Sequence, residues 1–80
     1  MYQFVVGKVY QPNDRSFDPV RVTKRTARFV FLENPINSAK WRMLIRTDAD
    51  GNEYATDSSV PARYRDDFTY QAKYPCLDWE

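Results

Sequence analysis

The side chains of this sequence that could take part in binding chemistry are arginines and lysines on strand-like segments. Arg21 and Arg25 are predicted to share one face of a strand over residues 20–26. Lys40, Arg42 and Arg46 are predicted to share one face of another strand. If the two strands lie side by side in one sheet, their basic rows would form a cationic stripe that attracts phosphates or an acidic protein surface.

A plainer interpretation of these basic residues stays open. The wet face of a strand must be polar, and lysine or arginine there also discourages aggregation through strand edges. Charge segregation favours the functional interpretation. Residues 1–46 hold nine Lys and Arg against three Asp and Glu, a net charge of +6, whereas residues 47–80 hold three against eight, a net charge of −5. The formal net charge of +1 therefore conceals a basic first part and an acidic second part.

Aromatic side chains offer a second kind of contact. The chain has six Tyr, five Phe and two Trp, and exposed rings can stack on bases or pack against a partner protein. Most of these rings are needed for the core of so small a domain, which leaves few for a surface. The residues that we predict to contact a partner are Arg21, Arg25, Arg28, Lys40, Arg42, Arg46 and Tyr54.

The sequence offers little for catalysis. It contains no His, the commonest general base and metal ligand, and its one cysteine, Cys76, cannot make a zinc site. Hydrolytic triads that contain His are therefore excluded, and two glycines are too few for a Gly-rich phosphate loop. The adjacent acids Asp66 and Asp67 are interpreted as solvated surface. We therefore predict a non-enzymatic protein with no catalytic residue, no metal site and no cofactor.

Alternation of apolar and polar residues predicts a chain made of short strands. The predicted strands cover residues 2–10, 20–26, 27–33, 40–47, 53–56 and 68–74. Gly7 is expected to mark a bulge or bend in the first of them. Residues 11–19 read as a loop with Phe17 as its apolar anchor, and Pro61 fits the first turn of a short helical segment.

The segment DADGN at residues 48–52 admits two interpretations. It resembles the start of a calcium loop, but its glycine falls at the fourth position instead of the sixth, and Ser59 stands where the twelfth-position glutamate should be. The dipeptide Asp50-Gly51 suits the positive φ angles of a hairpin turn, and strand patterns flank it on both sides. We therefore predict a hairpin turn.

These elements favour an all-β fold, or a β fold with one short helical turn. We expect a small, strongly bent antiparallel barrel of five or six strands, SH3-like or OB-like, and the length of 80 residues favours the SH3-like form. The whole chain, residues 1–80, is predicted to be a single domain. Within it, residues 1–56 are expected to form the barrel core and residues 57–80 a C-terminal extension packed on the barrel.

Three short motifs carry a resemblance to known proteins. They are VGKVY at residues 6–10, RTAR at residues 25–28 and RMLIRTDADGNEY at residues 42–54. This pattern resembles a group of small proteins, mostly without assigned function, that are encoded by phages and other bacterial mobile elements. The tail from Asp57 onward does not match the group. The resemblance implies a compact SH3-like β fold and a setting in which small non-catalytic proteins block host defence enzymes, as anti-CRISPR and anti-restriction proteins do.

Two functions follow as hypotheses. The first is a binding protein that inhibits a bacterial defence nuclease complex by protein-protein contact, through either the basic stripe or the acidic second part of the chain. The second is a small nucleic-acid-binding module in which arginines hold phosphates while Tyr54 or Trp41 stacks on a base. We expect a macromolecular partner, a protein rather than a nucleic acid, with no membrane and no small-molecule substrate.

The expected location is the cytoplasm. A single cysteine cannot form an internal disulfide, so a reducing compartment is the simplest interpretation. Residues 1–10 lack a basic leader followed by an apolar block, and no later run approaches the roughly 20 apolar residues of a membrane span.

Overall fold

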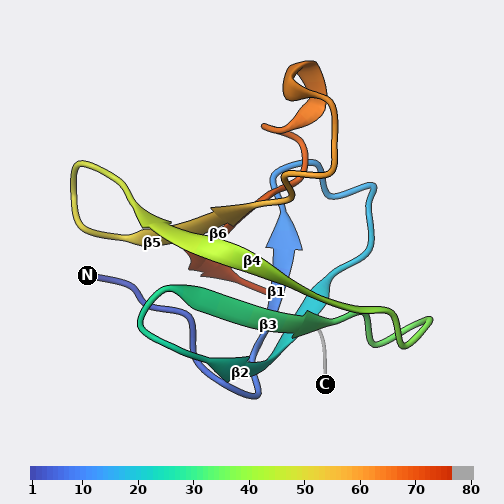
Figure 1. Cartoon of the computed structure of the whole chain (residues 1–80), viewed down its shortest axis with the longest axis horizontal. Coiled ribbons are helices and arrows are strands. Elements are labelled where there is room, and N and C mark those ends of the chain that lie inside the picture. Colours follow the sequence, from blue (N-terminus) through green and yellow to red (C-terminus); the bar gives the residue numbers. More distant parts are fainter. Residues whose placement is uncertain (77–80) are drawn as a thin grey trace.

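The computed structural model, which describes residues 1–76, is a closed antiparallel β-barrel with one short 3-10 turn (Figure 1). Its elements are β1 (Val9–Pro12), β2 (Val20–Arg25), β3 (Phe29–Glu33), β4 (Lys40–Thr47), β5 (Glu53–Thr56), η1 (Ala62–Tyr64) and β6 (Thr69–Pro75). Each strand pairs with the next along the chain, and β6 pairs back with β1 to close the barrel. The predicted fold class, a small all-β SH3-like barrel of five or six strands, is confirmed.

The core of the barrel is formed by the inward-facing side chains of all six strands. Alternation on β4 was the clearest sequence signal, and it is confirmed because Met43 is buried while Trp41 and Ile45 pack against the core. The fully enclosed part combines aromatic and aliphatic side chains, which lets a chain of 80 residues fill its interior with few large groups. The core residues are Phe4, Tyr10, Val20, Val22, Val30, Leu32, Met43, Ala55, Tyr70 and Ala72.

The sequence pattern placed the start of β1 too early. The strand begins at Val9 instead of Tyr2, and it continues through Pro12, where a loop was predicted. Gly7 explains the difference: its φ of 92° belongs to a turn, in which the Lys8 N–H donates to the Val5 carbonyl at 3.1 Å. Residues 1–5 alternate like a strand but lie across one end of the barrel.

A β-bulge in β2 changes which side chains face outward. Arg21 pairs with Glu33 and Val22 with Leu32, but the next pair joins Lys24 to Phe31, so that Thr23 is the extra residue. An inserted residue reverses the alternation beyond it. Arg25 consequently faces inward, and the prediction that Arg21 and Arg25 share one strand face is wrong.

The second part of the chain belongs to the barrel wall. A helical turn followed by a strand over residues 68–74 is confirmed by η1 and β6, with the strand at Thr69–Pro75. However, β6 hydrogen-bonds to both β1 and β5, so the predicted boundary between a core and an extension after residue 56 falls inside the barrel. Residues 77–80 of the predicted extension lie outside the described residues.

The predicted hairpin between β4 and β5 is confirmed. Gly51 has a φ of 82°, and its N–H donates to the Asp48 carbonyl at 3.0 Å. The Asp48 carboxylate accepts hydrogen bonds from the backbone N–H groups of Asp50 at 2.9 Å and Asn52 at 3.0 Å. The aspartate at the start of DADGN therefore organises the turn, as Asp does in many tight turns.

Candidate functional site

The outward side chains of β3, β4 and β5, together with Lys24 of β2, form a surface that mixes basic and aromatic groups. Register places Lys24 and Arg42 on either side of Phe31, Leu44 opposite Phe29, and Arg46 opposite Tyr54. We call this the outer face, defined by Lys24, Phe29, Phe31, Arg42, Leu44, Arg46 and Tyr54.

Two cations of the outer face lie over its rings. The Arg42 guanidinium carbon is 4.6 Å from the centroid of the Phe29 ring, and the Lys24 ammonium is 5.5 Å from that of Phe31. Such contacts favour this placement of the two charged groups, because the electron-rich ring face attracts the cation. They also cover part of the apolar surface that the two phenylalanines expose on the outside of the barrel.

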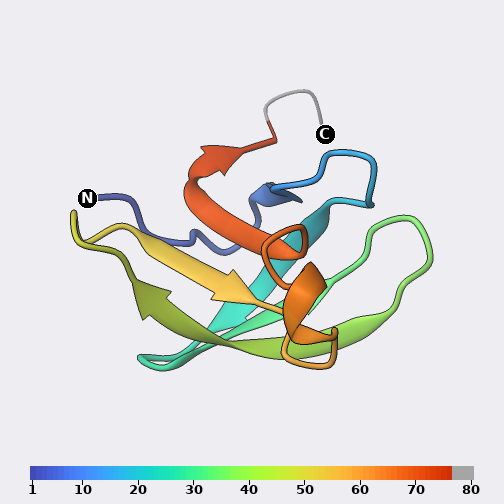
Figure 2. The same ribbon diagram turned by 90° about the horizontal axis from the view of Figure 1, so that it is seen from above.

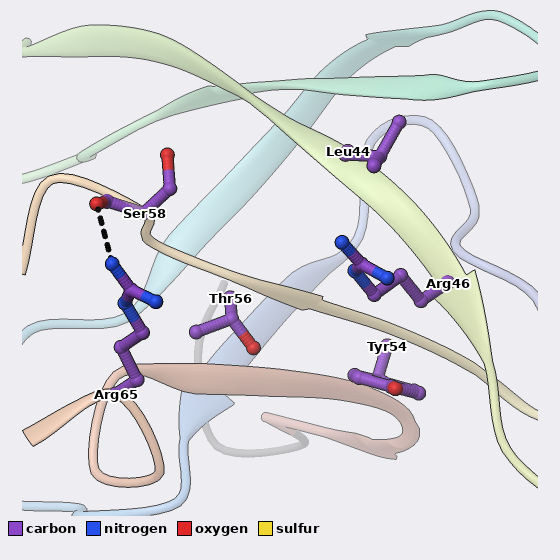
Figure 3. Close-up of a pocket in the computed structure, with 6 residues that line it drawn as sticks. All are labelled: Leu44, Arg46, Tyr54, Thr56, Ser58 and Arg65. Carbon is purple, nitrogen blue, oxygen red and sulfur yellow. Dashed lines mark hydrogen bonds between the residues drawn. The ribbon is translucent and has the colours of Figure 1, made fainter. Parts of the chain in front are cut away.

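Beside these rings, the outer face is hollowed into a depression of about 500 Å³ that contains two arginines (Figure 3). Arg46 comes from β4, and Arg65 follows η1. In the view of Figure 3, Thr56 lies between the two arginines. We call this hollow the arginine depression; it is lined by Leu44, Arg46, Tyr54, Thr56, Ser58 and Arg65.

Arg65 is held in place by backbone acceptors. Its Nε donates to the Val60 carbonyl at 3.1 Å, and one terminal nitrogen donates to the Ser58 carbonyl at 3.4 Å. No ion pair among residues 1–76 involves Arg65 or Arg46. Two guanidinium groups that no carboxylate of residues 1–76 pairs with therefore share one hollow, which Tyr54, Thr56 and Ser58 also line. Such a set can hold a carboxylate or a phosphate, because arginine presents several donors in a planar fork.

The structure divides the residues predicted to contact a partner. Arg42, Arg46 and Tyr54 come together on the outer face. Arg28 lies exposed at the β2–β3 hairpin. Lys40 forms an ion pair with Glu33 at 3.8 Å. Arg21 on β2 lies directly across from Glu33 in the strand register. A carboxylate thus interrupts the cationic stripe at that end of the sheet.

Arg25 is separated from the other predicted contact residues, because it faces the end of the barrel. Its two terminal nitrogens donate to the two carboxylate oxygens of Glu53 at 2.6 and 2.8 Å. Its guanidinium also donates to the Phe4 carbonyl at 2.9 Å, while the Phe4 N–H donates to Glu53 Oε1 at 2.8 Å. The pair therefore fixes residues 1–5 over the barrel end, and Phe4 enters the core in edge-to-face contact with Tyr10.

Arg65 is a site residue that the sequence pattern did not reveal. It lies in residues 47–80, whose net charge is negative, so the net charge of that part gives no sign of a basic site residue. Its place in the same depression as Arg46 depends on the course of the segment between β5 and β6. The only signal in the sequence is an arginine that follows Tyr64 within the predicted helical turn.

The Arg25–Glu53 pair makes stability depend on pH. The hydrogen bonds from Arg25 are the main cause that lowers the pKa of Glu53 below its ordinary value of 4.5. A carboxylate whose pKa is lower in the folded state stabilises the protein fully above its unfolded pKa, and this contribution disappears as the pH falls through the folded pKa.

We therefore expect the urea midpoint to fall between about pH 6 and about pH 3, and to fall less in the Glu53→Gln variant. Urea unfolding followed by tryptophan fluorescence at several pH values measures this difference. Parallel pH profiles for the wild type and Glu53→Gln would show that Glu53 is not the titrating group responsible.

Within residues 1–76, no three His, Cys, Asp or Glu side chains gather closely enough to hold a metal ion. The same residues contain no helix that is long and apolar enough to cross a membrane.

Comparisons with protein-family models, with curated proteins and with solved structures find no match to this chain. The outer face and the arginine depression are therefore the features from which a function can be inferred.

Proposed function

We propose that this protein is a non-enzymatic binding protein that recognises an acidic surface of a partner protein through the outer face of β3, β4 and β5. One observation carries the proposal: Arg46 and Arg65, neither in an ion pair within residues 1–76, line one depression together with Tyr54. Side chains of glutamate or aspartate on the partner would supply the missing carboxylates.

The apolar part of the same face favours a protein partner. Leu44 is 37% exposed at the rim of the depression, and the rings of Phe29 and Phe31 are half-buried beneath cations. Arginine, tyrosine and other aromatic residues are the types enriched in the centres of protein interfaces. An apolar residue at the rim adds contact area that a bare polyanion would not use.

The class of partner follows from the sequence resemblance. Small mobile-element proteins of this kind are expected to bind and block bacterial defence nucleases. We therefore propose a defence nuclease complex as the partner and inhibition by contact as the mode of action. The inhibitor would occupy an acidic surface of the complex, and no bond would be made or broken.

A nucleic-acid-binding module is the second candidate function. The observation that favours it is the same hollow, where two arginines could hold phosphates while the ring of Tyr54 stacks on a base. Binding through several phosphates would weaken steeply with salt, by about a thousandfold or more between 50 and 200 mM for six or more contacts.

Removing the two arginines is expected to abolish inhibition. The Arg46→Ala, Arg65→Ala double variant should lose at least about a hundredfold in affinity, because it removes two charge-assisted hydrogen bonds worth about 1.5 kcal/mol or more each. Cleavage of labelled DNA by purified defence nuclease complexes, with each variant added, measures the effect. Arg15→Ala is the matched control, because Arg15 is exposed on the β1–β2 loop and does not line the depression.

The outcomes separate the candidate functions. Inhibition by the wild type and by Arg15→Ala, but not by the double variant, would support the proposal. No inhibition of any tested complex, together with a salt-sensitive mobility shift of DNA or RNA, would replace it with the second function. The absence of both would contradict the two functions together.

A further inference from the structure

A second cavity lies at the opposite end of the barrel from the Arg25–Glu53 pair. Figure 2 shows the β1–β2 loop and the β3–β4 loop on the side of the barrel away from the N-terminus and the β4–β5 turn. The segment after η1 contacts the β1–β2 loop, because the Asn13 side-chain amide donates to the Asp66 carbonyl at 2.9 Å. The cavity has a volume of about 220 Å³. It is lined by Phe17, Asp18, Val20, Asn34, Trp41, Asp57, Phe68 and Tyr70.

Four aromatic residues contribute to the walls. Phe17, the loop residue predicted to be an apolar anchor, packs on Phe68 with ring centroids 4.3 Å apart, which ties the β1–β2 loop to the start of β6. Tyr70 is 5% exposed at the base. The buried indole nitrogen of Trp41 has no hydrogen-bond partner among residues 1–76. Rings of this kind attract cations through their electron-rich faces.

Two carboxylates line the same hollow, that of the exposed Asp18 and that of the half-buried Asp57, and each is fixed by hydrogen bonds. Asp18 Oδ2 accepts from the side-chain amide of Asn34 at 3.1 Å, and Asn34 is itself 7% exposed. Asp57 Oδ1 accepts from the N–H of Ser59 at 3.0 Å and from its hydroxyl at 2.6 Å. Neither carboxylate forms an ion pair with a residue of the described chain. The cavity therefore carries two negative charges that no cation within residues 1–76 neutralises.

Tyr70 lies close enough to both carboxylates for their charges to affect its pKa. Burial, together with the negative charges of Asp57 and Asp18, raises the pKa of Tyr70 to about 12. The phenol is neutral at neutral pH, as tyrosine ordinarily is, and adds no charge of its own. A cation placed beside it would meet two carboxylates and apolar ring surface and would keep part of its hydration, because Asp18 is exposed.

From this arrangement we propose that the cavity binds the cationic head of a lysine or arginine side chain of a partner protein. The volume is below the roughly 300–1,000 Å³ of pockets for drug-sized ligands, so a side-chain head fits it better than a whole metabolite. The site has the opposite charge to the arginine depression and adjoins it in sequence, because Asp57 lies between Thr56 and Ser58. Nucleic acids carry no such cation, so a protein is the partner that matches both sites.

A titration of the ¹⁵N-labelled protein tests this site without knowledge of the partner. The probes are the acetylated, amidated forms of lysine, trimethyllysine and arginine, and norleucine in the same form is the neutral analogue. We expect the indole N–H resonance of Trp41, assigned with the Trp41→Phe variant, to shift saturably with the cationic probes and not with norleucine. The three cations distinguish ammonium, methylated ammonium and guanidinium as the preferred head.

Neutralising the carboxylates provides the matched variants. Asp18→Asn and Asp57→Asn should each weaken binding of the cationic probes by about tenfold, since loss of about 1.4 kcal/mol corresponds to that ratio. Asp50→Asn, at the exposed tip of the β4–β5 turn, should leave the affinity unchanged. Unchanged dispersion of the ¹⁵N spectrum shows that each variant is folded, and either of the two cavity variants suffices for the test. Equal shifts with norleucine, no saturable shift with any cation, or equal affinities in all variants would overturn the proposal.

Discussion

Replacing Glu53 by alanine is expected to lower the free energy of unfolding by about 3 kcal/mol, because it leaves the charge of Arg25 at the barrel end without its partner. Glu53 is only 7% exposed and accepts three hydrogen bonds, two from Arg25 and one from the Phe4 N–H. All three are lost together. Residues 1–5 would also lose an acceptor that holds them over the core.

Urea unfolding at neutral pH measures this change, and Glu33→Ala is the matched control. Glu33 also pairs with a basic residue, Lys40, but the distance is 3.8 Å and the lysine side chain is 74% exposed. Exposed pairs of this kind contribute about 1 kcal/mol or less. Similar losses of stability in the two variants would show that the Arg25–Glu53 pair has no special structural role.

Leu32→Ala is expected to destabilise the barrel by about 3 kcal/mol, because it leaves a void in the closely packed core. Leu32 is 2% exposed and lies on β3 between its partners on β2 and β4. Two neighbouring strands hold its backbone in place, which limits collapse of the surroundings into the void. The same measurement of urea unfolding applies.

Leu44→Ala offers the same chemical change on the opposite side of the sheet. Leu44 is 37% exposed on the outer face, so its loss should change stability by about 0.5 kcal/mol or less. Under the proposed function, it should instead weaken partner binding. A large loss of stability in Leu44→Ala, or a small one in Leu32→Ala, would contradict the assignment of inner and outer faces.

Much of the barrel could be predicted from the sequence because its strands alternate regularly. The pattern of Trp41, Met43 and Ile45 placed β4 correctly, and Asp50-Gly51 marked the hairpin that follows. These signals are local, since a period of two and a turn dipeptide depend only on neighbouring residues. Local signals of the same kind predicted a helical turn followed by a strand over residues 68–74, which correspond to η1 and β6.

The bulge at Thr23 could not be predicted from the sequence. It places Lys24, and not Arg25, on the outer face. Nothing in the alternation of β2 shows that Lys24 and Arg25 exchange faces, because the extra residue is defined by the partner strand. For the same reason, the buried position of Glu53 could not be inferred, since its partner lies 28 residues away in sequence. The bulge and the burial of Glu53 both depend on residues that are distant in sequence.

The candidate site was predicted only in part. Arg42, Arg46 and Tyr54 lie on regular strands, so their shared face follows from register. Arg65 joins them through an irregular segment, and the cavity lined by Asp18 and Asp57 assembles from three loops. The division of charge along the sequence does not become a division in space, because β6 lies between β1 and β5.

Because β6 closes the barrel, the fold can be completed only after β6 has been synthesised and has left the ribosome. The strand that seals β1 to β5 is translated after both of them, so until Thr69–Pro75 emerges, the nascent chain exposes two unpaired strand edges. Unpaired edges are templates for misassociation between chains. Chaperone dependence and the yield of soluble product should therefore respond strongly to slow codons or truncation within residues 57–75, and weakly to slow codons in the β2–β4 meander.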